Sequence, residues 1–139
     1  MRSKTEGPAI RGVETEKITI NLGFIDLGQI DLLVREGFYN NRTDFIRMAI
    51  RNQIGTHADV LKQTVARKTL VLGLQRYSRA ELEAVVAAGE KLSINVLGLA
   101  AIAEDVSPEL ARAAIASVVV LGALHASPAV RAALSDRIR

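Results

Sequence analysis

The stretch Lys17-Ile18-Thr19-Ile20-Asn21-Leu22 decides the fold of the first half of the chain. Its polar and apolar side chains alternate strictly, which is the pattern of a β-strand with one face turned to a core. A lone strand leaves its backbone groups unpaired, and no second strand is predicted within about the next forty residues. We therefore expect this strand to pair with the same strand of a second chain.

Two amphipathic helices are expected after the strand. The first should begin at Asp26 or Gly28 and end at Gly37, where a left-handed C-cap is wanted. Asn41 is a good N-cap for the second, which Gly55 should end or kink. One strand and two helices of this size are too small to bury their apolar faces alone, so the pattern predicts a dimer.

These residues resemble the ribbon-helix-helix superfamily of Arc-, MetJ- and CopG-type repressors. The resemblance is carried by the runs KITINL and IDLLVREGFYNNRTDFIRMAIRNQI and covers about residues 16–55. In that family the strands of two intertwined chains form an antiparallel ribbon that lies in the major groove of DNA. The resemblance thus implies a sequence-specific DNA-binding homodimer. One departure is that Gly23, Phe24 and Ile25 lie between the strand and the expected first helix.

The resemblance also implies which residues meet DNA. The outward side chains of the ribbon, expected to read base edges, are Lys17, Thr19 and Asn21. Lys donates to guanine acceptors, Asn pairs with adenine, and Thr makes polar or methyl contacts. The start of the second helix is expected to bind a phosphate through Asn41, Arg42 and Thr43. The alternative is that these groups are the solvated faces of an ordinary edge strand and helix.

A repeat of about 25 residues occupies the second half. Its copies are 71–74 (VLGL), 96–99 (VLGL) and 120–123 (VLGA), and Ser78, Ser107 and Ser127 are plausible N-caps for a helix after each. Near-continuous apolar strands such as 93–99 and 117–121 suit a parallel sheet covered by helices. The likeness to leucine-rich repeats is architectural only, and the open edges of so short a sheet favour self-association.

The predicted fold class is therefore α+β or α/β, with a ribbon-helix-helix dimer followed by three β/α units with parallel strands. The expected divisions are a flexible arm (1–15), the DNA-binding domain (16–55), a helical linker (56–68) and an assembly or effector domain (69–139). Lys and Arg number 11 against 8 Asp and Glu in residues 1–68, a net charge of +3, and 7 against 7 thereafter. The surplus places a polyanionic partner in the first half.

Composition excludes several classes of function. The chain has no cysteine, which removes disulfides and thiol chemistry and favours a reducing, cytoplasmic location. His57 and His125 are the only histidines, too few for the three or four ligands of a transition-metal site. No enzyme motif, cofactor site or membrane-spanning segment is predicted, and double-stranded DNA is the expected partner.

Three functions stay open at this point. The first is a transcriptional repressor whose second half makes tetramers or longer arrays, or holds an effector. The second is an antitoxin or plasmid-partition protein with the same DNA-binding domain. The third is a scaffold that polymerises through the open-edged repeat.

Overall fold

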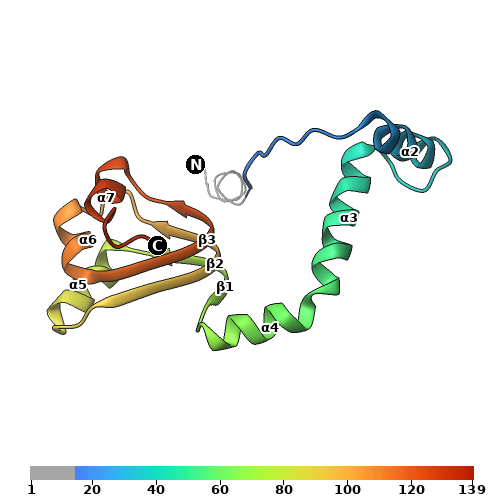
Figure 1. Cartoon of the computed structure of the whole chain (residues 1–139). Coiled ribbons are helices and arrows are strands. Elements are labelled where there is room, and N and C mark those ends of the chain that lie inside the picture. The colour runs from blue at the N-terminus through green and yellow to red at the C-terminus, as the bar shows by residue number, and fades with distance from the viewer. Residues whose placement is uncertain (1–14) are drawn as a thin grey trace. The chain divides into compact units, whose positions relative to one another are not determined.

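The computed structural model describes residues 15–139, which fall into two units. One is Lys17–Thr64, here called the head, and the other, here called the sheet domain, comprises residues 15–16 and Val65–Arg139. Figure 1 labels the helices and strands of both. The arm expected over 1–15 lies outside the described residues, apart from residue 15. The division between the units falls inside α4 (Ala58–Arg67), within the segment expected to be a helical linker.

Helix α2 (Phe24–Arg35) opens the helical part of the head. It begins at Phe24, earlier than expected, because the extended Gly23 serves as N-cap and its carbonyl accepts from Leu27 N at 3.0 Å. Its end agrees with the sequence: Gly37 has φ +90°, and the amides of Gly37 and Phe38 bond back to the last turn of the helix. This paired C-terminal motif satisfies carbonyls that the helix leaves without partners.

Helix α3 (Arg42–Thr56) begins where the sequence predicted. Asn41 Oδ1 accepts from Asp44 N at 2.8 Å, so Asn41 is its N-cap, and Asp44 Oδ2 in turn accepts from Asn40 N at 3.0 Å. Helix α3 ends at Thr56, one residue after Gly55, and His57 alone separates it from α4. A glycine inside a helix costs only about 1 kcal/mol relative to alanine, and flanking residues outweigh that cost here.

The sheet domain holds three parallel strands in the order β1-β2-β3, which confirms the predicted parallel arrangement. The strands are β1 (Val71–Tyr77), β2 (Leu92–Ile102) and β3 (Ile115–His125), the last two longer than the sequence suggested. The repeat is in register across the sheet: Gly73 lies beside Gly98, and Gly98 beside Gly122.

A helix follows each strand of the sheet. These are α5 (Arg79–Ala87), α6 (Pro108–Ala114) and α7 (Pro128–Ala133). The three predicted serine N-caps are confirmed, because Ser78, Ser107 and Ser127 accept hydrogen bonds from first-turn amides at 3.1–3.2 Å. At α5 the Glu81 carboxylate also accepts from Ser78 N at 3.0 Å, which completes a capping box.

The core of the sheet domain lies between the helices and one face of the sheet. Alternate residues of β2 supply Ile94, Val96, Ala100 and Ile102, and Leu82 of α5 packs among them. The cluster has twelve buried residues in all. The remaining seven are Val106, Leu134 and residues of α6, β3 and α7. The sheet domain thus has an interior of its own on one side of its sheet.

Candidate nucleic-acid interface

The segment 17–22 is neither helix nor paired strand in the single chain. The side chains expected to read DNA bases, Lys17, Thr19 and Asn21, are exposed. So is the opposite set, with Ile18 at 72% and Ile20 at 59% exposure. A strand is defined by its hydrogen-bonded neighbour, and this chain offers none to the segment within its described part. The ribbon therefore remains a prediction that requires two chains.

An apolar groove lies beside this segment in the head. It has a volume of about 390 Å³ and is lined by Ile20 and Leu22 together with apolar residues of α2 and α3, namely Ile30, Leu33, Phe45, Ile46, Ala49 and Ile50, and by the polar Asp26 and Gln29 of α2. Ile30 is the only buried residue in the described part of the head. Exposed aliphatic surface of this extent is typical of a face that a partner covers.

The start of α3, expected to bind phosphate, combines three residues with different roles. The Asn41 side chain is occupied as N-cap through its bond to Asp44 N. The amides of Arg42 and Thr43 have no acceptor within residues 15–139 and lie in the first turn, where backbone dipoles favour an anion. This turn can therefore offer two backbone donors to a phosphate, and the Asn41 Oδ1, which is an acceptor, is engaged in capping the helix.

Arg42 itself forms a two-pronged ion pair with Asp31 of α2. Nε and Nη2 donate to Oδ1 and Oδ2, each at 2.8 Å. The hydrogen bond from Arg42 holds the pKa of Asp31 below its usual value, and the same contact raises the pKa of Arg42. Sequence reasoning missed this pair, because the two residues are eleven positions apart and on different helices. The bridge joins α2 to α3 and partly neutralises the charge expected to meet phosphate.

The comparison with known families covers more than the head. A model of the ribbon-helix-helix transcriptional regulator family matches residues 13–131. The chain belongs to this family. No curated protein and no solved structure matches it. The match extends through most of the sheet domain, so the family includes that domain as well as the 16–55 segment on which the resemblance rested. Membership makes this chain a DNA-binding transcriptional regulator.

Other basic side chains of the regulator's head carry no such bridge. Lys17, Arg35, Arg47 and Arg51 form no ion pair among the residues that the structure describes. All four are exposed. Exposed cations without an ion pair are the side chains that can neutralise phosphates, and the sequence-independent attraction to DNA depends on the number of phosphates neutralised.

The two histidines of the regulator lie in different units. His57 follows α3, with Nε2 3.5 Å from Nε2 of Gln53, and His125 ends β3. No group of three His, Asp or Glu side chains suited to a metal ion occurs in residues 15–139. None of the helices described there is long and apolar enough to cross a membrane.

Proposed function

We propose that this regulator is a homodimeric repressor that recognises a specific DNA sequence through a two-stranded ribbon. The observation that carries the proposal is a head without a core, in which Ile30 alone is buried among the described residues. Pairing of two 17–22 segments would satisfy their backbone groups and cover the groove beside them at once. Both requirements are met by the same partner, a second copy of the head.

In the proposed dimer the alternation of the segment separates two tasks. Ile18, Ile20 and Leu22 face the shared core, and Lys17, Thr19 and Asn21 face the major groove. A two-stranded ribbon has the width that this groove admits, and each good side-chain pairing contributes about 1–3 kcal/mol of discrimination between bases. A dimer on a promoter competes with polymerase for the same DNA, which is why we assign repression as its effect.

Phosphate contacts are proposed at the start of α3. The free amides of Arg42 and Thr43 are the best-supported donors, because the guanidinium of Arg42 is shared with Asp31. Such contacts fix orientation on the duplex without reading sequence. The Asn41 side chain acts here through the geometry of the helix cap and not by direct contact.

The sheet domain bears on the choice between a repressor and an antitoxin. It has thirteen of the fourteen buried apolar residues of the described chain and is thus a folded body. An antitoxin usually binds its toxin through a tail that is disordered until bound. We therefore prefer the repressor, and a folded second domain is compatible with assembly or with an effector.

The proposal is tested by sequencing the genomic DNA fragments that the purified full chain retains. We expect a short, two-fold symmetric sequence to be enriched. Replacement of Lys17, Thr19 and Asn21 by Ala should remove that enrichment, while Lys91→Ala, which takes one exposed charge from the sheet domain, should leave it unchanged. Fragments with no shared sequence, or enrichment that survives the triple replacement, would contradict ribbon reading.

A further inference from the structure

Within residues 15–139, no helix covers one of the two faces of the sheet. The alternate residues that do not enter the core point to this open face, and in strand order they are Leu72 and Leu74 of β1, Leu97 and Leu99 of β2, and Val119, Leu121 and Ala123 of β3. Leu72 is 73% exposed and Leu121 54%, whereas Leu99, in the middle strand of this face, is only 8% exposed. Parallel sheets are found almost only with both faces covered. The helices cover only the other face.

A row of glycines divides the open face. Gly73, Gly98 and Gly122 are neighbours across the three strands and have φ of +123°, +141° and +123°. A Cβ on Gly98 would lie 2.3 Å from the Gly73 carbonyl oxygen, and one on Gly122 would lie 2.0 Å from that of Gly98. Only glycine suits these two positions. Each copy of the repeat therefore supplies one strand and one glycine of the row, which is here called the crease.

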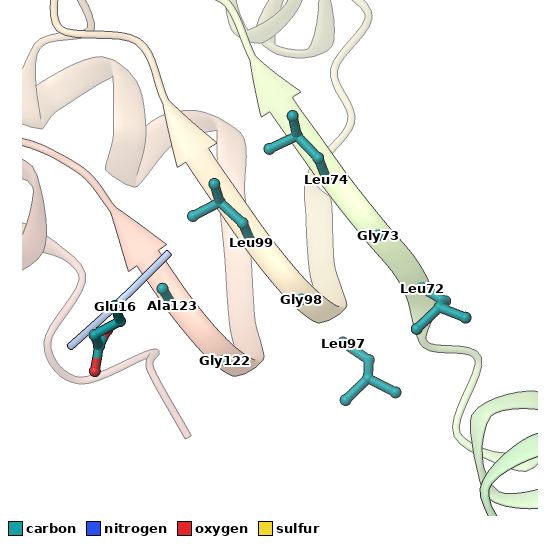
Figure 2. Close-up of a pocket in the computed structure, with 9 residues that line it drawn as sticks. All are labelled: Glu16, Leu72, Gly73, Leu74, Leu97, Gly98, Leu99, Gly122 and Ala123. Atoms are coloured by element: carbon teal, nitrogen blue, oxygen red, sulfur yellow. The ribbon is translucent and has the colours of Figure 1, made fainter. Parts of the chain in front are cut away.

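The crease separates two apolar ridges. Figure 2 shows Leu72 and Leu97 on one side of the glycine row and Leu74, Leu99 and Ala123 on the other. A cavity of about 570 Å³ lies along the row, lined by both ridges. A ridge beside a groove is self-complementary, since a copy related by a two-fold axis can place its ridge in the groove of the first.

The open face carries little charge, which favours a second copy over a charged partner. The rows from Val71 to Leu74 and their neighbours on β2 and β3 contain no ionisable residue, although Glu16 lines the cavity beside them. Polar groups bound these rows at both ends, with Asn95 and Ser117 before them and Arg76 and His125 after them. An apolar centre with a polar rim is the usual composition of a protein interface.

The size of the face indicates which second copy can cover it. Strands about 4.8 Å apart, with six rows shared by all three strands about 3.3 Å apart, give a face of roughly 290 Å² per copy and about 570 Å² in a pair. Specific complexes between free proteins bury about 1,200–2,000 Å². A face this small holds a partner only when another contact keeps the two together, because tethering raises the effective concentration to the millimolar range.

We propose that the open face packs against the same face of a second copy inside the dimer held by the head. The inference rests on the proposed function for that dimer and adds a second contact to it. The two leucine ridges interlock across the glycine creases, which covers the apolar face of both sheets. Association is then directed through the face of the sheet, whereas the sequence had suggested its edges.

The absence of cysteine allows a direct test with the full chain. The change Leu97→Cys places one thiol at the centre of the open face, and Ala84→Cys places one on the exposed side of α5. A bifunctional maleimide that spans the roughly 10 Å between packed sheets should link two chains of the first variant and not of the second. The linked fraction should stay constant over a hundredfold range of protein concentration. No link, equal links in both variants, or links that vanish on dilution would overturn the proposal.

Two further variants test which contact brings the two thiols together. Adding Leu121→Asp to the Leu97→Cys chain puts a charge at an exposed position of the face and should abolish the link while the head still forms a DNA-binding dimer.

Glu16 also lines the crease (Figure 2), so removal of residues 1–14 tests the arm as the occupant. We expect unchanged links; links that appear only after the removal would overturn the proposal in favour of the arm. A DNA-binding dimer without links refutes the face pairing alone, and a monomer without links refutes the proposed function as well.

Discussion

The head and the sheet domain differ in where their apolar residues lie. In the sheet domain, thirteen apolar residues are buried within one chain, whereas the described head buries Ile30 alone. Both have amphipathic elements with regular caps, so local structure does not explain the difference. The sheet domain pairs its strands with one another, and the head has a single candidate strand and nothing within residues 15–139 to pair it with. The head is therefore the part of this protein that lacks a core in a single chain.

The largest expected effect comes from breaking the interface between the two heads of the proposed dimer. In Ile20→Asp a carboxylate would be buried without a partner in the shared core of the ribbon, and burial of an unpaired charge is prohibitive. We expect a monomer by light scattering and a loss of DNA affinity of at least about 100-fold, a loss of about 2.7 kcal/mol or more in binding free energy. Thr19→Ala, on the outer face, is the matched control and should remain a dimer. A dimeric Ile20→Asp protein would contradict the comparison.

A second change compares glycines of the two units. Gly98→Ala puts a methyl group 2.3 Å from the Gly73 carbonyl oxygen at φ +141°, so the free energy of unfolding should fall by about 1–3 kcal/mol or more. Gly28→Ala in α2 meets nothing within 4 Å and should raise it by about 0.4–1 kcal/mol. Urea titration of both variants measures the difference. Equal stability of the two variants would show that the crease is not required.

A third change tests the bridge that sequence reasoning missed. Asp31→Asn releases the Arg42 guanidinium and removes one negative charge from the head. Exposed ion pairs contribute little, so stability should change by less than about 1 kcal/mol. DNA affinity should rise, with a salt dependence steeper by about one ion, because Arg42 becomes free to meet phosphate. Asp136→Asn, which frees Arg112 in the sheet domain, is the control and should leave affinity unchanged. Weaker binding by Asp31→Asn would mean that the bridge orients the site.

The smallest effect is a dependence of stability on pH. Hydrogen bonds from Arg42 and Arg112 hold the pKa of Asp31 and Asp136 below the ordinary 3.8. A carboxyl group with a lowered pKa in the folded state stabilises the protein above its unfolded pKa, and this contribution is lost as pH falls through the lowered value. The difference in unfolding midpoint between wild type and Asp136→Asn should therefore be small at pH 6 and vanish near pH 2. A difference that grows on acidification has the wrong sign for this account.

How far the sequence predicted the structure depended on the range of the interactions. Asn41, Ser78 and Ser107 were correctly predicted as caps, because a cap involves residues only three positions apart. The parallel register also followed from the repeat of the glycines. By contrast, the Arg42–Asp31 bridge depends on how two helices cross, and no periodicity in the sequence encodes that.

The open face shows a second limit of prediction from sequence. Near-continuous apolar strands indicated burial on both sides of the sheet, and only the structure reveals that α5, α6 and α7 cover one side. The segment 17–22, predicted as a strand, shows the same limit in the head, since its alternation indicates two faces but not what lies against either. Both gaps concern partners, which local patterns do not specify.

The central claim is that two 17–22 segments pair across a dimer, and amide hydrogen exchange of the full chain measures this most directly. The account predicts slow exchange for amides of this segment in wild type, even though the single chain offers them no acceptor in a paired strand, and fast exchange in Ile20→Asp. Exchange should slow further on addition of the enriched DNA. Amides of 17–22 that exchange at the rate of an unstructured peptide in concentrated wild-type protein would contradict the paired ribbon and the DNA reading built on it.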